Sequence, residues 1–394
     1  MSTLVLILSQ CFTGITAYSQ DNLSTDLDSE LESFAKRTVI FLKQQEQTQI
    51  SVGRIDGVGK ASIPGGPGIA KKLQQTLKLQ KEVAISDTAT WTVQGDLFFG
   101  DGGDGELNGG ADGTLTTRDL SLTIHFRLIN TKTRATVEDK VVITKLSQLP
   151  TITGATFQTS PNADVRESRT SFVQGLAAEP FIDPKSPSRV RTTSDSPYSL
   201  ELRAKPIGAE SAKKGVPIAS KIEQRPGIIA TAMQPFAFSP IDKNQVYEVV
   251  VGNGSDREIA VSVSIDGIDV FSFTENVDPK TNKSLFTHFI VAPHSELVVP
   301  GWHKTIDSQR DDNFLAFLVT EYGKGASSKL FPQKAIDGSV GAVTVAISKS
   351  FLPTDGAKSA RAETGFGPPV KQDQKAVERA IDPPHAFITI RYDR

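Results

Sequence analysis

The chain has 394 residues, with 43 Lys and Arg against 45 Asp and Glu, which gives a net charge of −2. This balance argues against bulk binding of nucleic acid, because such proteins neutralise many phosphates with an excess of cations. The one cysteine excludes a disulfide framework, a cysteine-based zinc site and an iron–sulfur cluster. At roughly 100–200 residues per domain, the length allows two or three domains.

Residues 1–19 have the pattern of a signal peptide. An apolar run from Leu4 to Leu8 precedes Ala17-Tyr18-Ser19, whose small residues suit a cleavage site before Gln20. A buried apolar start of the mature fold is the alternative interpretation. No other segment is long and apolar enough to span a membrane as a helix. The sequence therefore predicts a periplasmic or extracellular protein without a transmembrane segment in the mature chain.

Residues 26–182 are predicted to form an α/β sheet domain. Apolar residues at helical spacing alternate with short segments of strand periodicity, and this mixture is typical of helices packed on a sheet. The expected helices span 26–45, 69–79 and 164–178, and the expected strands span 49–55, 83–85, 90–99, 120–128 and 135–145.

This part of the chain resembles a known family. The turn Gly66-Pro67-Gly68-Ile69 leads into a helix, the strand Thr92-Val93-Gln94-Gly95-Asp96-Leu97 follows, and a long hairpin runs from Leu120 through Val142. These features resemble the small α/β domain of cell-envelope lipoproteins that activate penicillin-binding proteins or form the curli secretion pore. The resemblance implies an envelope location and a docking role for this domain.

The second half is predicted to be an antiparallel β-sandwich of jelly-roll type over residues 195–350, after an exposed linker at 183–194. Asn253-Gly254 and Asp266-Gly267 are hairpin signals, since both dipeptides tolerate positive φ. Residues 204–234 are expected to be a long loop. An irregular tail at 351–394 ends in a strand, 386–392, expected to return to the sandwich. The expected strands span 198–202, 246–251, 259–265, 268–273, 285–292, 295–299, 314–322 and 340–348. This half resembles an uncharacterised β-sandwich of exported bacterial proteins.

The loop from Gly100 to Gly113 contains acidic residues that can supply oxygen ligands to Ca²⁺. Asp101, Asp104 and Asp112 are the candidate metal ligands. The EF-hand pattern fails because Gly103 and Gly105 stand where further ligands are required. The alternative is a flexible hairpin loop without a metal.

Trp302 and His303 are the candidate ligand-binding residues. They follow Pro300-Gly301 at a predicted corner, where an exposed indole can serve as a platform for a sugar or peptide. The alternative is a structural corner in which Trp302 packs against the sandwich and His303 bonds to a turn. His288 and His294 lie nearby in the sequence, so adjacent hairpin arms offer a second possible arrangement, a metal site.

No catalytic residues and no cofactor are predicted, because neither a nucleophile elbow nor a phosphate-binding loop is complete in the sequence. Basic residues between Arg203 and Arg225 are expected to be solvated, or else to touch anionic polymers. We expect a non-enzymatic exported envelope protein, a docking or assembly module for an envelope protein or polysaccharide. The alternatives are a secreted carbohydrate- or peptidoglycan-active enzyme and a self-assembling surface subunit. The sequence does not predict the oligomeric state.

Overall fold

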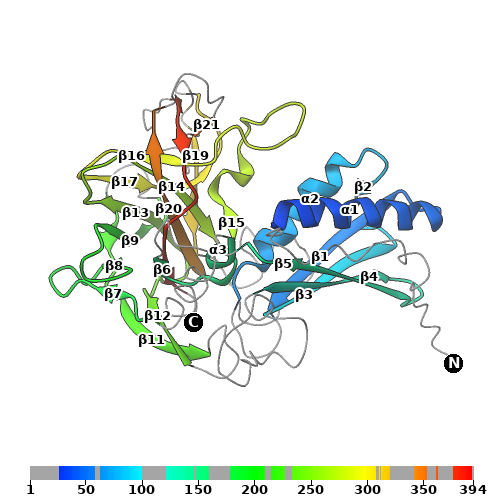
Figure 1. The fold of residues 1–394 in the computed structure, drawn as a ribbon, viewed down its shortest axis with the longest axis horizontal. Coiled ribbons are helices and arrows are strands. Elements are labelled where there is room, and N and C mark those ends of the chain that lie inside the picture. The colour runs from blue at the N-terminus through cyan, green and yellow to red at the C-terminus, as the bar shows by residue number, and fades with distance from the viewer. Residues whose placement is uncertain are drawn as a thin grey trace.

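The structure is a computed structural model of the whole chain. It describes residues 26–57, 63–99, 121–145, 148–158, 178–208, 214–226, 233–307, 310, 312–319, 341–352, 361–362 and 376–392. These residues form an α+β fold that is rich in sheets (Figure 1). Within the described ranges, no helix combines the length and the hydrophobicity that crossing a membrane requires.

The first sheet has five strands in the order β2-β1-β3-β4-β5. β1 is parallel to both of its neighbours, while β3, β4 and β5 form an antiparallel meander. The predicted strands of this region are all present, with bounds β1 Gln49–Gly57, β2 Ala84–Ile85, β3 Trp91–Phe99, β4 Leu122–Asn130 and β5 Thr136–Ile143.

Two helices, α1 (Leu27–Gln44) and α2 (Gly66–Leu79), cover one face of this sheet (Figure 1). Asp26 caps the N-terminus of α1: its carboxylate accepts a 2.9 Å hydrogen bond from the Ser29 amide and so satisfies a free donor of the first turn. Phe34 of α1 stacks on Phe126 of β4 with ring centroids 4.1 Å apart. The apolar stripe of each helix therefore packs on the sheet.

A second sheet contains eight strands. Its main order is β18-β19-β13-β9-β8-β7, with β10 paired to β9 and β17 paired to β13. The bounds are β7 Phe181–Ile182, β8 Arg189–Arg191, β9 Tyr198–Pro206, β10 Val216–Pro217, β13 Gln245–Asn253, β17 Ser295–Val299, β18 Gly301–His303 and β19 Phe314–Leu318.

A third sheet contains nine strands in the main order β11-β12-β24-β20-β14-β15, with β16, β23 and β6 attached to β14, β20 and β24. β24, close to the C-terminus, lies between β12 and β20, so the last part of the chain is central to this sheet. The bounds are β6 Phe157–Gln158, β11 Lys221–Pro226, β12 Met233–Phe238, β14 Ile259–Ile265, β15 Ile268–Asp269, β16 Phe289–Val291, β20 Ala342–Phe351, β23 Ala380–Ile381 and β24 Ala386–Arg391.

The remaining elements are short. α3 (Leu149–Thr153) ends at Gly154, which has a φ of 68°, and leads into β6. A 3₁₀ helix, η2 (Val270–Phe273), follows β15. β21 (Arg361–Ala362) and β22 (Val377–Glu378) pair with each other as a separate two-stranded sheet.

Two hydrophobic clusters hold the sheets together. One is shared by the eight-stranded and nine-stranded sheets and includes Val249 and Val251 of β13 and Val263 of β14. The other lies at the helices and the five-stranded sheet, and it continues to Phe387 of β24 and Ala346 of β20. The nine-stranded sheet therefore contributes apolar side chains to both clusters.

Several stretches differ from the sequence expectation. Residues 204–234, expected to be a long loop, contain the end of β9 and the strands β10, β11 and the start of β12. Residues 183–194, expected to be an exposed linker, contain β8, whose Val190 is fully buried. Residues 268–273, expected to be a strand, form β15 and then η2. Short strands whose side chains are partly charged do not show the apolar alternation used for prediction.

Candidate functional site

The predicted calcium ligands Asp101, Asp104 and Asp112 lie outside the described residues, as do the predicted signal peptide and the predicted helix at 164–178. Trp302 and His303 lie on β18, at an end of the eight-stranded sheet. The candidate site is therefore built from β18 and the segments that contact it.

Trp302 is a core side chain, with only 9% of its surface exposed. Its indole meets Phe273 and Phe317 edge-to-face, with ring centroids 5.0 and 5.3 Å apart. Such edge-to-face pairs add to the stabilisation that burial itself provides. In this position the indole offers little surface to a sugar or a peptide.

His303 is completely buried beside Trp302. Its Nδ1 lies 2.7 Å from the Thr274 hydroxyl, and its ring lies 4.8 Å from the ring of Phe271. The same hydroxyl donates to the Lys304 carbonyl at 3.2 Å and accepts from the Asn276 amide at 3.1 Å. Thr274 thus ties the imidazole to the backbone of two segments.

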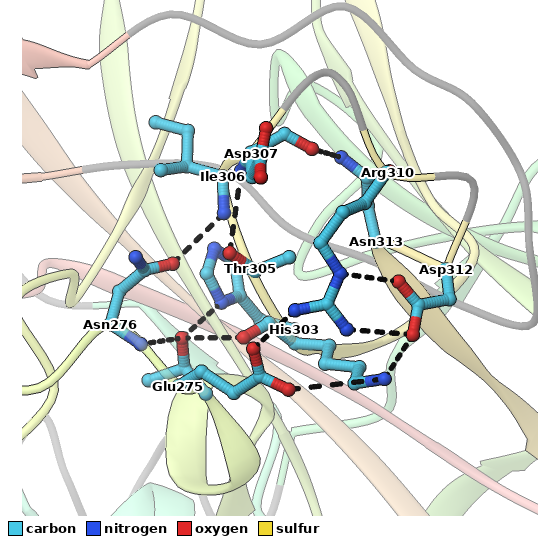
Figure 2. A network of polar contacts seen from close by, with 11 residues as sticks. Glu275, Asn276, His303, Thr305, Ile306, Asp307, Arg310, Asp312 and Asn313 are labelled. Carbon is cyan, nitrogen blue, oxygen red and sulfur yellow. Dashed lines mark hydrogen bonds and ion pairs between the residues drawn. The ribbon is translucent and has the colours of Figure 1, made fainter.

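Four charged side chains form an ion-pair network next to Thr274 and His303 (Figure 2). They are Glu275, Lys304, Arg310 and Asp312. Arg310 makes a two-pronged contact to Asp312, with both N–O distances 2.7 Å, and reaches Glu275 at 2.5 Å. Lys304 contacts Asp312 and lies 3.8 Å from Glu275. Hydrogen bonds from Arg310 and then Lys304 hold the pKa of the Asp312 carboxyl far below its usual range.

Two amide side chains of the network bind the backbone of the loop between β18 and β19. Asn276 accepts a 2.9 Å hydrogen bond from the Ile306 amide, and Asn313 donates a 3.0 Å hydrogen bond to the Asp307 carbonyl. Figure 2 shows Asn276 on the opposite side of the His303 ring from Asp312. Two cations and two carboxylates neutralise one another, and the amides bind backbone groups. Chemically, this arrangement fixes a loop in place.

The other histidines near His303 in the sequence have different partners. His294 Nε2 lies 2.8 Å from the Asp256 carboxylate, and His288 Nδ1 lies 2.9 Å from the Thr287 hydroxyl. Burial lowers the pKa of His288 to about 4, so its ring is neutral at pH 7. Among the residues that the structure describes, no three His, Cys, Asp or Glu side chains are grouped to hold a metal ion.

A second polar cluster, which the sequence analysis missed, lies between β9 and β13. Lys205 Nζ and Glu248 Oε1 are 2.5 Å apart, and each residue is only 7% exposed. The Gly215 amide donates to the other oxygen of Glu248 at 3.2 Å. The sequence signal for this pair is the strand periodicity of β9, which puts the Lys205 side chain on the face of the strand opposite that of Leu202.

The basic residues between Arg203 and Arg225 are largely paired with glutamates. Arg203 contacts Glu201, while Lys221 and Arg225 both contact Glu223 at 2.8 and 3.0 Å. The expectation of a loop is wrong for these residues, because they lie on β9 and β11, while contact with anionic polymers stays a prediction. In each of these pairs the carboxylate lies two positions from the cation on the same strand, β9 or β11.

Comparisons of the chain with protein-family models, with curated proteins and with solved structures find no match. The resemblance to envelope lipoproteins therefore rests on the sequence pattern alone.

Proposed function

We propose that the chain is a non-enzymatic exported protein of the cell envelope that works as a docking or assembly module. The observation that carries this proposal is the mutual pairing of its charged clusters. In the network of Figure 2 two cations face two anions, and Lys205 faces Glu248. Groups paired in this way fix loops and strands, and they are poorly placed to act as acid, base or nucleophile.

The proposed layout is a signal peptide followed by two modules, in the periplasm or outside the cell. The first module is the α/β sheet domain, and the second is a β-sandwich made by the eight-stranded and nine-stranded sheets. The hydrophobic cluster shared by these two sheets supports the sandwich. We assign docking of an envelope partner to the α/β part, and adhesion or assembly to the sandwich.

The test uses the purified full-length chain. We expect it to form a complex of fixed stoichiometry with one envelope component, which can be rebuilt from purified parts and shows no substrate turnover. Hydrolysis of peptidoglycan or polysaccharide that a single carboxylate substitution abolishes would instead identify an enzyme. Large homo-oligomers in size-exclusion chromatography, without a partner, would identify a self-assembling subunit.

A further inference from the structure

His385 lies where the eight-stranded and nine-stranded sheets contact each other. It directly precedes β24 of the nine-stranded sheet, while Tyr198 is the first residue of β9 in the eight-stranded sheet. The Nε2 atom of His385 lies 3.4 Å from the Tyr198 hydroxyl, and the two rings meet edge-to-face with centroids 5.6 Å apart. This pair of side chains therefore links the beginning of β24 to the other sheet.

Two prolines precede His385 in the segment that leads into β24. Pro383 and Pro384 have no backbone N–H groups and so donate no hydrogen bonds to β20. The amides of Asp382 and His385, on either side of the prolines, donate to backbone carbonyls of β20 at 3.1 and 2.9 Å. The position of this short segment therefore depends strongly on His385, through its backbone bond and its contact with Tyr198.

The surroundings of His385 suit a neutral imidazole. Only 8% of the residue is exposed, and its Nδ1 atom has no hydrogen-bond partner among the described residues. A neutral ring can leave one nitrogen as a bare acceptor, whereas the protonated ring carries an N–H group on both nitrogens. Protonation would therefore place an unpaired N–H group of a charged ring in the interior, which is unfavourable.

The charged groups near His385 also oppose its protonation. Burial, and then repulsion from Lys349 of β20, lower the pKa of His385, while Asp382 acts in the opposite direction. β8 also contacts β24, and its Arg189 and Arg191 are paired with carboxylates. The carboxylate of Asp382 thus offsets the effects of burial and of Lys349 only in part.

We propose that His385 and Tyr198 form a pH-sensitive latch that holds this end of the two sheets closed at neutral pH and releases it in mild acid. In the closed state the neutral ring of His385 packs on Tyr198. Below about pH 6.5 a proton binds more readily to an imidazole in water than to the buried one, so acid favours a state in which the ring leaves Tyr198. The latch is a property of the chain itself and needs no docking partner.

The direction of the pH effect follows from proton linkage. The open state binds more protons than the closed state, so the free energy that holds the latch closed falls as pH drops below about 6.5. One proton changes the population of the open state by at most about tenfold per pH unit. The effect is therefore local and graded, and it is distinct from unfolding of the whole chain.

The first test follows the imidazole signals of the isotope-labelled, full-length wild-type chain by NMR as the pH is lowered. We expect His385 to titrate below about pH 6.5. The exposed His294 is the internal reference. Titration of His385 at or above this pH would overturn the proposal, because the closed state would then favour the cation. This measurement needs no variant, so it is decisive even if a substituted chain folds poorly.

Hydrogen exchange of backbone amides measures the opening itself. Between about pH 7.5 and pH 5.5 we expect the protection of residues 385–388 to fall about threefold or more, after correction for the intrinsic pH dependence of exchange. His385→Gln has a neutral side chain at every pH, so this dependence should disappear. His294→Gln is the matched control, since it removes an exposed imidazole, and it should keep the wild-type dependence.

Three exchange results would overturn the latch. The first is unchanged protection of residues 385–388 in the wild-type chain, and the second is an equal loss in His385→Gln. The third is a loss confined to β16, which follows His288, because burial lowers the pKa of that histidine to about 4 and its titration would then explain the effect.

Discussion

Gly68 of α2 and Gly267 of the turn between β14 and β15 meet backbone to backbone. A Cβ atom added to Gly68 would lie 2.1 Å from the Gly267 carbonyl oxygen, and the Gly68 amide donates to the Asp266 carbonyl at 3.3 Å. Gly267 has a φ of 73°, a conformation that other residues rarely adopt. The N-terminal turn of α2 therefore packs directly against the β14–β15 turn of the nine-stranded sheet.

Gly68→Ala should destabilise the protein by about 2–4 kcal/mol, because the added methyl group collides with rigid backbone. Helix propensity alone would give the opposite sign, a gain of up to about 1 kcal/mol. Urea unfolding measures the difference. Gln75→Ala, at a half-exposed position of the same helix, is the control and should change stability by less than about 0.5 kcal/mol. A stabilised Gly68→Ala variant would show that the two segments separate easily.

A fragment of residues 26–182 should not unfold cooperatively. Its hydrophobic cluster includes Phe387 and Ala346, which the fragment lacks, and Phe157 would lose the Phe387 ring that lies 6.4 Å from its own. Circular dichroism against temperature, compared with the full-length chain, measures this. A sharp transition at the same temperature would mean that the α/β part folds independently of β20 and β24.

Asp269 should make the protein more stable in mild acid. Burial raises its pKa to about 6 from 3.8, although its carboxylate accepts a hydrogen bond from the Phe271 amide. Between these two pH values the folded state binds more protons than the unfolded state, so the unfolding free energy falls as pH rises through this window. The deprotonated form is then destabilised by about 1–3 kcal/mol above pH 6.

Asp269→Asn should therefore raise the unfolding free energy at about pH 7.5 and leave it nearly unchanged at about pH 4. The comparison must be between variants, because His288, with a pKa lowered to about 4, gives stability that is lost on acidification. Denaturant melts over the pH range supply the data. Equal stability of Asp269→Asn and wild type at the higher pH would contradict the raised pKa.

Glu248→Gln should cost about 3–5 kcal/mol, because it leaves the buried Lys205 ammonium without its carboxylate. The double substitution Lys205→Met/Glu248→Leu should recover most of that loss, since both charges disappear together. A double-mutant cycle by urea unfolding measures the coupling. The exposed pair Lys36–Glu32 serves for comparison and should show a coupling of about 0.5 kcal/mol or less. Similar coupling in both pairs would mean that the buried pair is open to water.

Several elements can be predicted from strong periodicity in the sequence. The alternation from Leu122 to Leu128 predicted β4, and the helical spacing from Leu27 to Leu42 predicted α1. β11 is not predicted from the sequence, because Lys221, Glu223 and Arg225 occupy alternate positions and the strand has no apolar pattern. Sequence periodicity reveals a strand through its apolar face, and a strand whose alternate residues are charged gives no such signal.

The candidate site shows a second limit of sequence reading. Pro300 separates β17 from β18, but only the folded chain brings Trp302 to Phe273 and His303 to Thr274. Glu275 and Arg310 are separated by 35 positions, and no local pattern links two loops across that distance. Charge pairs of this kind depend on tertiary packing, which single-sequence periodicity does not encode.

Photo-crosslinking of the full-length chain tests the docking function most directly. The crosslinker is placed in turn at Gln75 on α2, at Gln94 on the five-stranded sheet and at Gln224 on β11, and each protein is exposed to envelope extract. Our account predicts one abundant protein adduct from Gln75 or Gln94 of the α/β part, a much weaker adduct from Gln224, and no substrate turnover. Equal, unspecific labelling at all three positions, together with turnover of a cell-wall polymer, would contradict it.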